Sequence, residues 1–121
     1  MDTKSGYPFW VIKNGLLSEY PVLERDVRCD VLVIGGGITG ALIADHLSRH
    51  GHDVVVVEQR DIGWGSTAAS TALIQYEIDT PMTELADRYG EPIAALAYST
   101  CVSGVEQLSV LARGLGDCRC V

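Results

Sequence analysis

Positive charge is scarce in this sequence, which has 9 Lys and Arg residues against 16 Asp and Glu and a net charge of -7. A protein that binds nucleic acid gains affinity by releasing counterions from phosphates, and this requires a surplus of basic side chains. Anionic lipid surfaces repel an acidic chain in the same way. The composition therefore argues against nucleic acids and membrane surfaces as partners.

Long apolar runs are also missing. The longest, Val31 to Ala44, contains four glycines, and at about 14 residues it is shorter than the roughly 20 that span a bilayer. The first residues, Met1 to Gly6, have no apolar core behind a basic cluster, so a secretory signal peptide is not predicted. We expect no membrane span.

The four cysteines do not form the spaced framework of a small secreted domain. A reducing compartment, and hence a cytoplasmic location, is the better interpretation. Cys118 and Cys120 resemble half of a metal site, but no second pair of ligands follows them, and a four-ligand zinc site is not expected. His46, His50 and His52 are expected to be solvated on the polar face of a helix, so we predict no metal site.

Hydrophobic residues make up 47% of the chain and charged residues 21%, which is typical of a folded domain. Residues 1–28 form a lead-in whose Pro and Gly positions predict turns and extended chain. Its aromatic residues, Tyr7, Phe9 and Trp10, either pack against the domain or belong to a loosely ordered arm. Residues 29–121 form the domain itself.

A β-α-β pattern opens this domain. Residues 29–34 and 53–57 are short apolar runs rich in β-branched residues, which predicts two buried parallel strands. Between them, residues 38–50 predict a helix that turns Ala41, Ala44 and Leu47 to the sheet and Asp45, His46, Arg49 and His50 to water. Gly51 is expected to end the helix.

Two further helices are predicted after a loop at residues 62–70. Thr80 as N-cap and Pro81 as first helical residue would open the first, which runs to about Tyr89. The second runs to about Leu115, ends at Gly116, and carries an apolar stripe assigned to core or interface. The stripe consists of Ile93, Leu96, Ala97, Cys101, Val105, Leu108, Leu111 and Leu115. The fold class is therefore α/β, a partial Rossmann-type domain with one βαβ unit plus following helices.

The glycine-rich turn between the first strand and the first helix is the main functional signal. Gly35, Gly37 and Gly40 supply G-x-G-x-x-G in the strand-turn-helix setting that this motif requires. Gly35 makes the turn, Gly37 lets a pyrophosphate approach the backbone, and Gly40 lets the helix pack on the sheet. The helix start, at Ile38 and Thr39, offers backbone amides to phosphates. A P-loop is excluded because Ala41 follows Gly40, where that motif has Lys.

An acidic residue stands where a dinucleotide fold binds ribose. Glu58 ends the second strand about 20 residues after the glycines, and a carboxylate there accepts hydrogen bonds from ribose hydroxyls. The same charge repels a 2′-phosphate and argues against NADP, although the neighbouring Arg60 complicates that argument. Gln59 and Arg60 are candidates for the same adenosine side of the site.

The segment after Glu58 separates FAD from NAD, because here the sequence resembles the glycine oxidase, sarcosine oxidase and D-amino acid oxidase superfamily of flavoenzymes. The resemblance rests on Asp30–Gly40, on Val57-Glu58, and above all on Ile62–Thr71, read as IGWGSTAAST. The aromatic lead-in and Gln75–Pro81 resemble one bacterial branch of the superfamily. The resemblance reaches to about Gly116, whereas the last residues do not look like the family.

The resemblance implies a site for FAD. Gly35, Gly37, Gly40 and Glu58 would hold the adenosine diphosphate half, and the loop would run under the flavin and its ribityl diphosphate chain. Gly65, Ser66, Thr67 and Ser70 would lie there, although turn composition alone also allows these hydroxyls to be ordinary loop residues. Because no His lies between Glu58 and Thr80, we expect the FAD to be bound non-covalently.

The resemblance also implies an activity. Relatives transfer a hydride from the carbon beside an amine nitrogen to the flavin, and the imine is then hydrolysed. The substrate would be a small amine or amino acid, and the residues that hold it would lie in later segments, so no catalytic residue is named. We expect this chain to be the N-terminal part of such an oxidoreductase, inactive alone. The alternatives are an NAD-binding dehydrogenase module and a non-catalytic truncated protein.

Overall fold

A computed structural model describes residues 6–15 and 18–115. The chain divides into two compact units, Met1–Thr71 and Ala72–Val121. The sequence division into a lead-in at residues 1–28 and a domain at residues 29–121 stays a prediction. Within the described ranges, no helix combines the length and the apolar character needed to cross a membrane.

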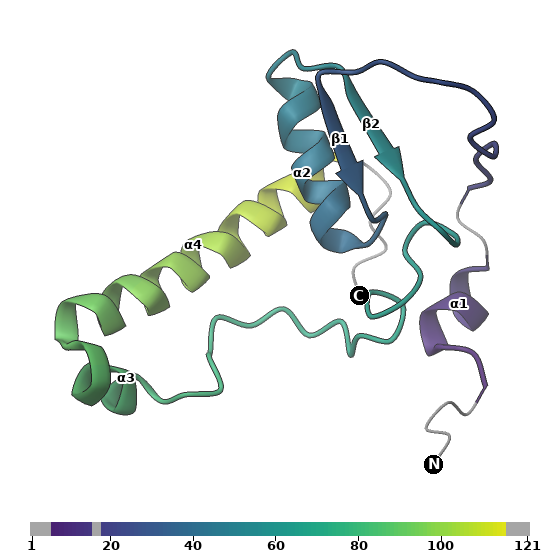
Figure 1. The fold of residues 1–121 in the computed structure, drawn as a ribbon. Coiled ribbons are helices and arrows are strands. Elements are labelled where there is room, and N and C mark those ends of the chain that lie inside the picture. Colours follow the sequence, from purple (N-terminus) through teal and green to yellow (C-terminus); the bar gives the residue numbers. More distant parts are fainter. Residues whose placement is uncertain (1–5, 16–17, 116–121) are drawn as a thin grey trace. The chain divides into compact units, whose positions relative to one another are not determined.

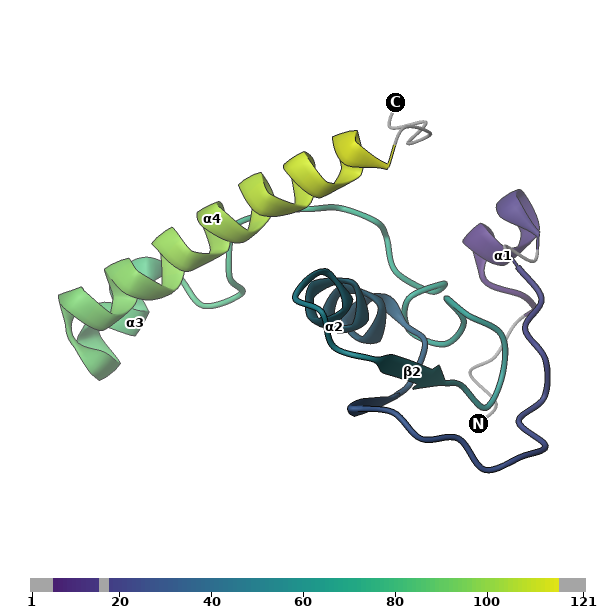
Figure 2. The ribbon, with the colours of Figure 1, turned by 90° about the horizontal axis from the view of Figure 1, so that it is seen from above.

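The first unit contains the predicted βαβ arrangement. Strand β1 (Val31–Ile34) leads through the glycine turn into helix α2 (Ile38–Arg49), and strand β2 (Val54–Val57) follows. The strands pair in parallel, in register from Val31 opposite Val54 to Ile34 opposite Val57. Helix α2 lies along one face of the pair (Figures 1 and 2). The prediction of an α/β, partial Rossmann-type fold is confirmed, with each element one or two residues shorter than expected.

The two faces of this small sheet differ in burial. Val33 points to α2 and is buried, with only 9% of its surface exposed. Its β1 neighbours on the other face, Leu32 and Ile34, are exposed, Ile34 to 82%. Successive side chains along a strand point to opposite faces of the sheet, so a single helix can bury only one of the two faces. The core of the unit therefore lies between β1, β2 and α2.

Helix α2 ends as the sequence predicts. Gly51 adopts a left-handed conformation with φ 87°. Its amide donates to the Ser48 carbonyl at 3.0 Å, and the His52 amide donates to the Leu47 carbonyl at 3.2 Å. These two bonds define a Schellman motif, in which glycine relieves the penalty of a left-handed residue.

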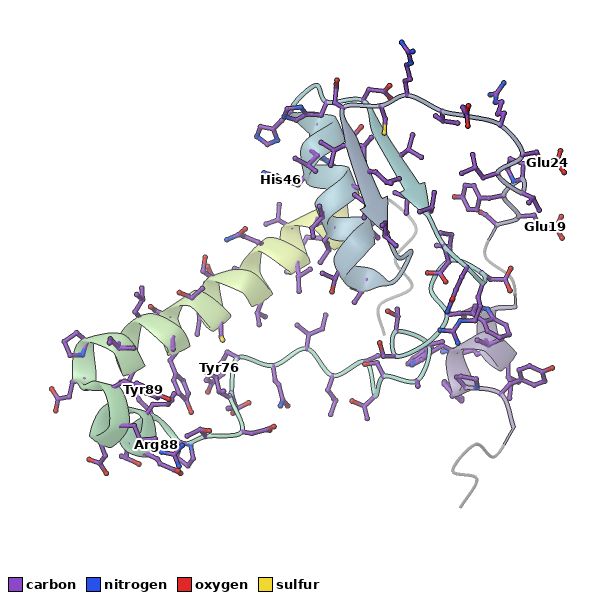
Figure 3. The ribbon with its side chains drawn as sticks, viewed as in Figure 1. Glu19, Glu24, His46, Tyr76, Arg88 and Tyr89 are labelled. Atoms are coloured by element: carbon purple, nitrogen blue, oxygen red, sulfur yellow. The ribbon has the colours of Figure 1, made fainter. Side chains whose placement is uncertain are left out.

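The faces of α2 differ in part from the prediction. Ala44 and Leu47 are half-buried as expected, but Ala41 is exposed and Asp45 is half-buried. Asp45 forms an ion pair with Arg49, one turn further on, at 2.8 Å, and this pair lies at the surface, with 40% of the Asp45 side chain exposed. His46 projects away from the sheet and is exposed, as expected (Figure 3).

The lead-in contains a helix where turns and extended chain were predicted, so that prediction is wrong at α1 (Phe9–Asn14). The helix breakers flank α1 and do not interrupt it. Pro8 is its N-cap, with φ -57°, and Gly15 is its C-cap, with φ 67°. Proline before a first turn and glycine after a last turn are compatible with a helix, and only an internal position would break it.

The second unit is a helical hairpin of α3 (Met82–Tyr89) and α4 (Glu91–Gly114), joined at Gly90 with φ 87° (Figure 1). The predicted start of α3 is wrong by one residue, because Pro81 and not Thr80 is the N-cap. The Pro81 carbonyl accepts the first helical bond, from the Leu85 amide at 3.0 Å. The carbonyl of Thr80 instead accepts the Tyr98 hydroxyl at 3.1 Å.

The apolar stripe of α4 is only partly buried. Ile93, Leu96 and Leu115 are exposed to 56%, 65% and 64%, so of the two predicted alternatives, core or interface, the core is wrong for these three residues and the interface stays a prediction. Ala94, which the stripe omitted, is completely buried. Helices α3 and α4 pack together, and a small side chain such as alanine allows two helices to approach closely. Leu115 is the C-cap of α4, and the predicted stop at Gly116 lies outside the described residues.

Candidate cofactor site

The glycine turn joins the end of β1 to the start of α2. Gly35 has φ 109°, a conformation that favours glycine, and its amide donates to the Val57 carbonyl of β2 at 2.8 Å. Gly37 is the N-cap of α2 and offers no side-chain cap. The first-turn amides of a helix have no partner within the helix itself. The turn therefore presents backbone donors beside the carboxyl ends of both strands.

Gly40 brings α2 close to this turn. A Cβ atom at Gly40 would overlap the Gly35 carbonyl oxygen and would lie 3.3 Å from Cγ1 of Val33. Because backbone atoms cannot move aside as a flexible side chain can, no larger residue fits without shifting the helix. The predicted role of Gly40 in helix packing is confirmed.

Glu58 immediately follows β2 and binds the glycine turn directly. Its Oε2 accepts the Gly36 amide at 2.7 Å, and its Oε1 accepts the Arg60 amide at 3.0 Å. The Gly36 amide, followed by the Arg60 amide, holds the pKa of the Glu58 carboxyl below its ordinary value, and the Arg60 charge adds to this effect. A carboxylate offers about four acceptor positions, so acceptor capacity remains after these two bonds.

The loop of residues 62–70 contacts the glycine turn through one of its glycines and one of its hydroxyl groups. The Gly63 amide donates to the Gly36 carbonyl at 2.9 Å. The Thr67 hydroxyl accepts the Ile38 amide at 3.0 Å, at the start of α2. A Cβ atom at Gly37 would lie 2.9 Å from that hydroxyl. The structure thus brings together three predicted regions: the glycine turn, Glu58 and the hydroxyl-bearing loop.

Gly36 is a site residue that the sequence reasoning did not assign. Its amide is taken by Glu58 and its carbonyl by Gly63. A Cβ atom there would overlap Cδ1 of Ile62 and lie 3.2 Å from the Glu58 Cβ. The x position of G-x-G is variable in the motif, so only the run of three consecutive glycines in this sequence could have indicated it.

The remaining predicted residues lie around this centre in different ways. Arg60 extends toward the loop, where its Nη2 would lie 3.1 Å from a Cβ atom at Gly65. The Gln59 amide adds slightly to the lowering of the Glu58 pKa, while the Gln59 side chain, like those of Thr39 and Ser66, is exposed. The Ser70 carbonyl accepts the Trp10 indole N–H at 2.8 Å.

The candidate metal ligands that the structure describes do not assemble. Across residues 6–15 and 18–115, no group of three or more His, Cys, Asp or Glu side chains is placed to hold a metal ion. His50 Nδ1 lies 2.7 Å from the His46 carbonyl oxygen of its own helix. Cys29 and Cys101 are free, half-buried thiols, whereas Cys118 and Cys120 lie outside the described residues.

Comparison with known proteins finds relatives that are similar to large parts of this chain. Gamma-glutamylputrescine oxidoreductase of Escherichia coli is 32% identical over 87 residues, 72% of this chain. A Bacillus subtilis protein, YhfW, named as a Rieske 2Fe-2S iron-sulfur protein, is 33% identical over 100 residues, 83% of this chain. Aerobic glycerol-3-phosphate dehydrogenase of Staphylococcus haemolyticus is 49% identical over 64 residues, 53% of this chain.

The matched segments are short parts of these relatives. The chain spans 20% of the Escherichia coli protein, 19% of the Bacillus protein and 10% of the Staphylococcus protein. No solved structure matches the chain. The family described as FAD dependent oxidoreductase matches residues 30–118, which include the glycine turn, Glu58 and the 62–70 loop. The chain therefore belongs to the FAD dependent oxidoreductase family, whose cofactor is FAD.

Proposed function

We propose that this chain forms the FAD-binding part of an oxidoreductase that oxidises the C–N bond of an amine or amino acid. The observation that carries the cofactor half is the bond from the Gly36 amide to Glu58 Oε2, 2.7 Å long. It fixes the carboxylate beside the glycine turn, where a dinucleotide would place its ribose. In this proposal residues 1–28 are a lead-in and residues 29–121 are the FAD-binding domain.

The residues present fit the adenosine diphosphate half of FAD. The free acceptor positions on Glu58 suit ribose hydroxyls, which are hydrogen-bond donors. A Cβ atom at Gly35 would meet nothing within 4 Å, so the turn is open beside β1. The amides at Gly37, Ile38, Thr39 and Gly40 form the positive end of α2, which favours diphosphate. Gln59 and Arg60 complete the adenosine side.

The 62–70 loop suits the other half of FAD. Gly65, Ser66, Thr67 and Ser70 offer hydroxyls and backbone groups with little side-chain bulk, which allows a flat ring system to approach. Arg60, lying against Gly65, adds positive charge near the diphosphate. When bound non-covalently, FAD would supply the acceptor for the hydride that leaves the substrate. The residues of this chain bind and orient that cofactor.

The amine substrate class is the finer part of the proposal. It is supported by the similarity to gamma-glutamylputrescine oxidoreductase, which extends over 72% of this chain. The similarity to glycerol-3-phosphate dehydrogenase has a higher identity, but it extends over only 53% of this chain. Because FAD-binding segments resemble one another across substrate classes, the longer of these two matches supports the amine class over the glycerol-3-phosphate class.

A titration tests the cofactor assignment. The chain is titrated calorimetrically with FAD, NAD and NADP, and we expect FAD to bind most tightly. In Gly37→Val the branched side chain would meet the Thr67 hydroxyl and stand where the diphosphate approaches, so FAD binding should be lost. Gly104→Ala is the control, because a Cβ atom there meets nothing within 4 Å. Tighter binding of NAD than FAD, or equal FAD affinity in Gly37→Val, contradicts the proposal.

Chimeras test the substrate class. Residues 30–118 replace the matching segment in gamma-glutamylputrescine oxidoreductase and, separately, in the Staphylococcus haemolyticus glycerol-3-phosphate dehydrogenase. Both chimeras are then assayed for bound FAD and for turnover of the parent's substrate. We expect the amine-oxidising chimera to retain more of its parent's turnover per bound FAD. The reverse order would contradict the amine assignment while leaving the FAD assignment intact.

A further inference from the structure

The aromatic lead-in contacts the 62–70 loop, although the two segments lie near opposite ends of the first unit in sequence. The Trp10 indole N–H donates to the Ser70 carbonyl oxygen at 2.8 Å, across 60 positions of sequence. The Tyr7 and Trp64 rings form a second contact, edge to face, with centroids 6.2 Å apart. These two contacts join the short helix α1, and Tyr7 two residues before it, to two separate points of the loop.

The indole is itself held in place. The Phe9 ring packs edge to face against Trp10, with centroids 4.9 Å apart. Lys13 Nζ lies 5.3 Å from the centroid of the Trp10 ring, within the range of a cation–π interaction. Trp10 is half-buried, whereas Ile12 of the same helix is 72% exposed. The side of α1 that bears Trp10 is therefore the side that contacts the loop.

Neither partner has much to keep it ordered alone. A helix of six residues is far shorter than the about 12 that an isolated helix needs in water. After Thr67, the backbone bonds of the loop are local: the Ala69 amide donates to the Gly65 carbonyl at 3.2 Å and the Ser70 amide to the Thr67 carbonyl at 3.3 Å. The order of α1 and the order of the loop's end at Ser70 therefore support each other.

The loop is bound to the glycine turn at Gly63 and Thr67, but its end at Ser70 is bound to α1. We infer that Trp10 is a positioning residue, which sets the flavin-side end of the 62–70 loop through its hydrogen bond to the Ser70 carbonyl. The inference rests on the proposed function, because it concerns the half of the site assigned to the flavin. It gives the lead-in a role in cofactor affinity.

In this assignment, different residues affect the binding of the two halves of FAD. Glu58 and the glycine turn hold the adenosine diphosphate half and make no contact with Trp10 among the bonds that the structure describes. Loss of the indole donor should therefore weaken FAD and leave ADP unchanged. A general loss of folding would weaken both ligands, so ADP affinity reports whether the βαβ unit is intact.

The experiment compares wild type, Trp10→Phe and Ile12→Ala. Phenylalanine keeps an aromatic ring but removes the N–H donor, and Ile12→Ala alters the exposed side of the same helix. FAD and ADP affinities are measured by calorimetry, and amide hydrogen exchange of residues 61–71 is measured without ligand. We expect Trp10→Phe to lower the affinity for FAD about threefold to tenfold, the effect of one neutral hydrogen bond. The amide hydrogens of residues 61–71 should also exchange faster in this variant. ADP affinity should stay unchanged, and Ile12→Ala should behave as wild type.

Two results would overturn the inference. One is unchanged loop exchange and unchanged FAD affinity in Trp10→Phe. The other is an equal loss of FAD and ADP, which assigns Trp10 to the stability of the fold as a whole. If wild type binds neither ligand, the proposed function fails and the cofactor role of Trp10 fails with it. The exchange measurement remains separate, since it reports the contact between α1 and the loop without any cofactor.

Discussion

Glu58 combines two tasks that its position at the end of β2 makes compatible. It accepts the Gly36 and Arg60 amides, and it keeps acceptor positions for a ligand. Hydrogen bonds to a charged acceptor are about twice as strong as neutral ones. The carboxylate therefore organises the glycine turn before any cofactor binds.

Replacing Glu58 with Gln should weaken FAD by about tenfold, because the charge-assisted bonds to ribose become neutral ones. Glutamine also replaces one of the two carboxylate oxygens with an NH₂ group. Either the Gly36 amide or the Arg60 amide would then face a donor and lose its present acceptor. Calorimetric titration of FAD measures the change. Glu24→Gln is the control, since Glu24 is exposed and points away from the unit (Figure 3). An equal loss of affinity in both variants would show a general charge effect.

The lowered pKa of Glu58 predicts an acid dependence of stability. Because the folded state favours the charged form, the stabilisation is fully present above the ordinary value of 4.5 and is lost as the pH falls through the lower folded pKa. Denaturant unfolding followed by tryptophan fluorescence, from pH 6 to about pH 3, measures this slope. The unfolding free energy should change less with pH in Glu58→Gln than in wild type. An identical pH dependence in the two proteins would show that Glu58 is not its source.

Gly40→Ala should destabilise the first unit by about 2 kcal/mol, because the added methyl group overlaps a backbone oxygen and the helix must shift. The overlapped atom is the Gly35 carbonyl oxygen, so the glycine turn should also be displaced. Trp10 and Trp64 are the two tryptophans of the chain and both belong to this unit, so their fluorescence follows its unfolding. Gly114→Ala is the matched control, with nothing within 4 Å of its added Cβ. A change below about 0.5 kcal/mol in Gly40→Ala would contradict the close packing.

At the scale of the elements, helix ends and helix interiors make opposite demands on glycine. Gly51 ends α2 with φ 87° and a Schellman pair of bonds. Gly104 lies inside α4, where a Cβ atom meets nothing within 4 Å. The same change to alanine should therefore have opposite signs at the two positions.

Gly51→Ala should lower the unfolding free energy by about 1 kcal/mol, since an L-residue is strained in the left-handed region. Gly104→Ala should raise it by up to about 1 kcal/mol, because alanine has the higher helix propensity. Denaturant unfolding is followed by fluorescence for the first variant and by circular dichroism for the second. Changes of the same sign would show that the caps or the hairpin packing differ from the described structure.

The whole molecule is organised as two compact units, and the site lies in the first of them. The second unit holds α3 and α4, 8 and 24 residues long, and so most of the helix. Tryptophan fluorescence reports the first unit, whereas circular dichroism at helical wavelengths reports mainly the second. A ligand of the first unit should therefore affect the two signals differently.

FAD at 100 times its dissociation constant adds about 2.7 kcal/mol to the stability of the state that binds it. The fluorescence-detected melting temperature should rise with FAD more than the dichroism-detected one. NAD at the same concentration should shift neither transition. Equal shifts by both probes would show that the two units unfold as one cooperative body.

Local features of this protein followed from the sequence. The βαβ order, the end of α2 at Gly51, and the meeting of Gly35–Gly40 with Glu58 depend on residue types and short spacings. Parallel strands place their carboxyl ends together, which is why a motif after one strand and an acid after the next lie side by side. The family followed from the same residues together with the 62–70 loop.

Only the tertiary structure decided which distant segments meet. The bond from Trp10 to Ser70 spans 60 positions, and no periodicity predicts it. The role of Gly36 depends on the packing of Ile62 and Glu58 against it. Ala94 is the buried residue of α4, although larger apolar side chains stand beside it in sequence, and a small side chain is what allows two helices to approach closely. Sequence patterns report local conformation and burial tendency, whereas pairing between remote residues depends on how the elements pack.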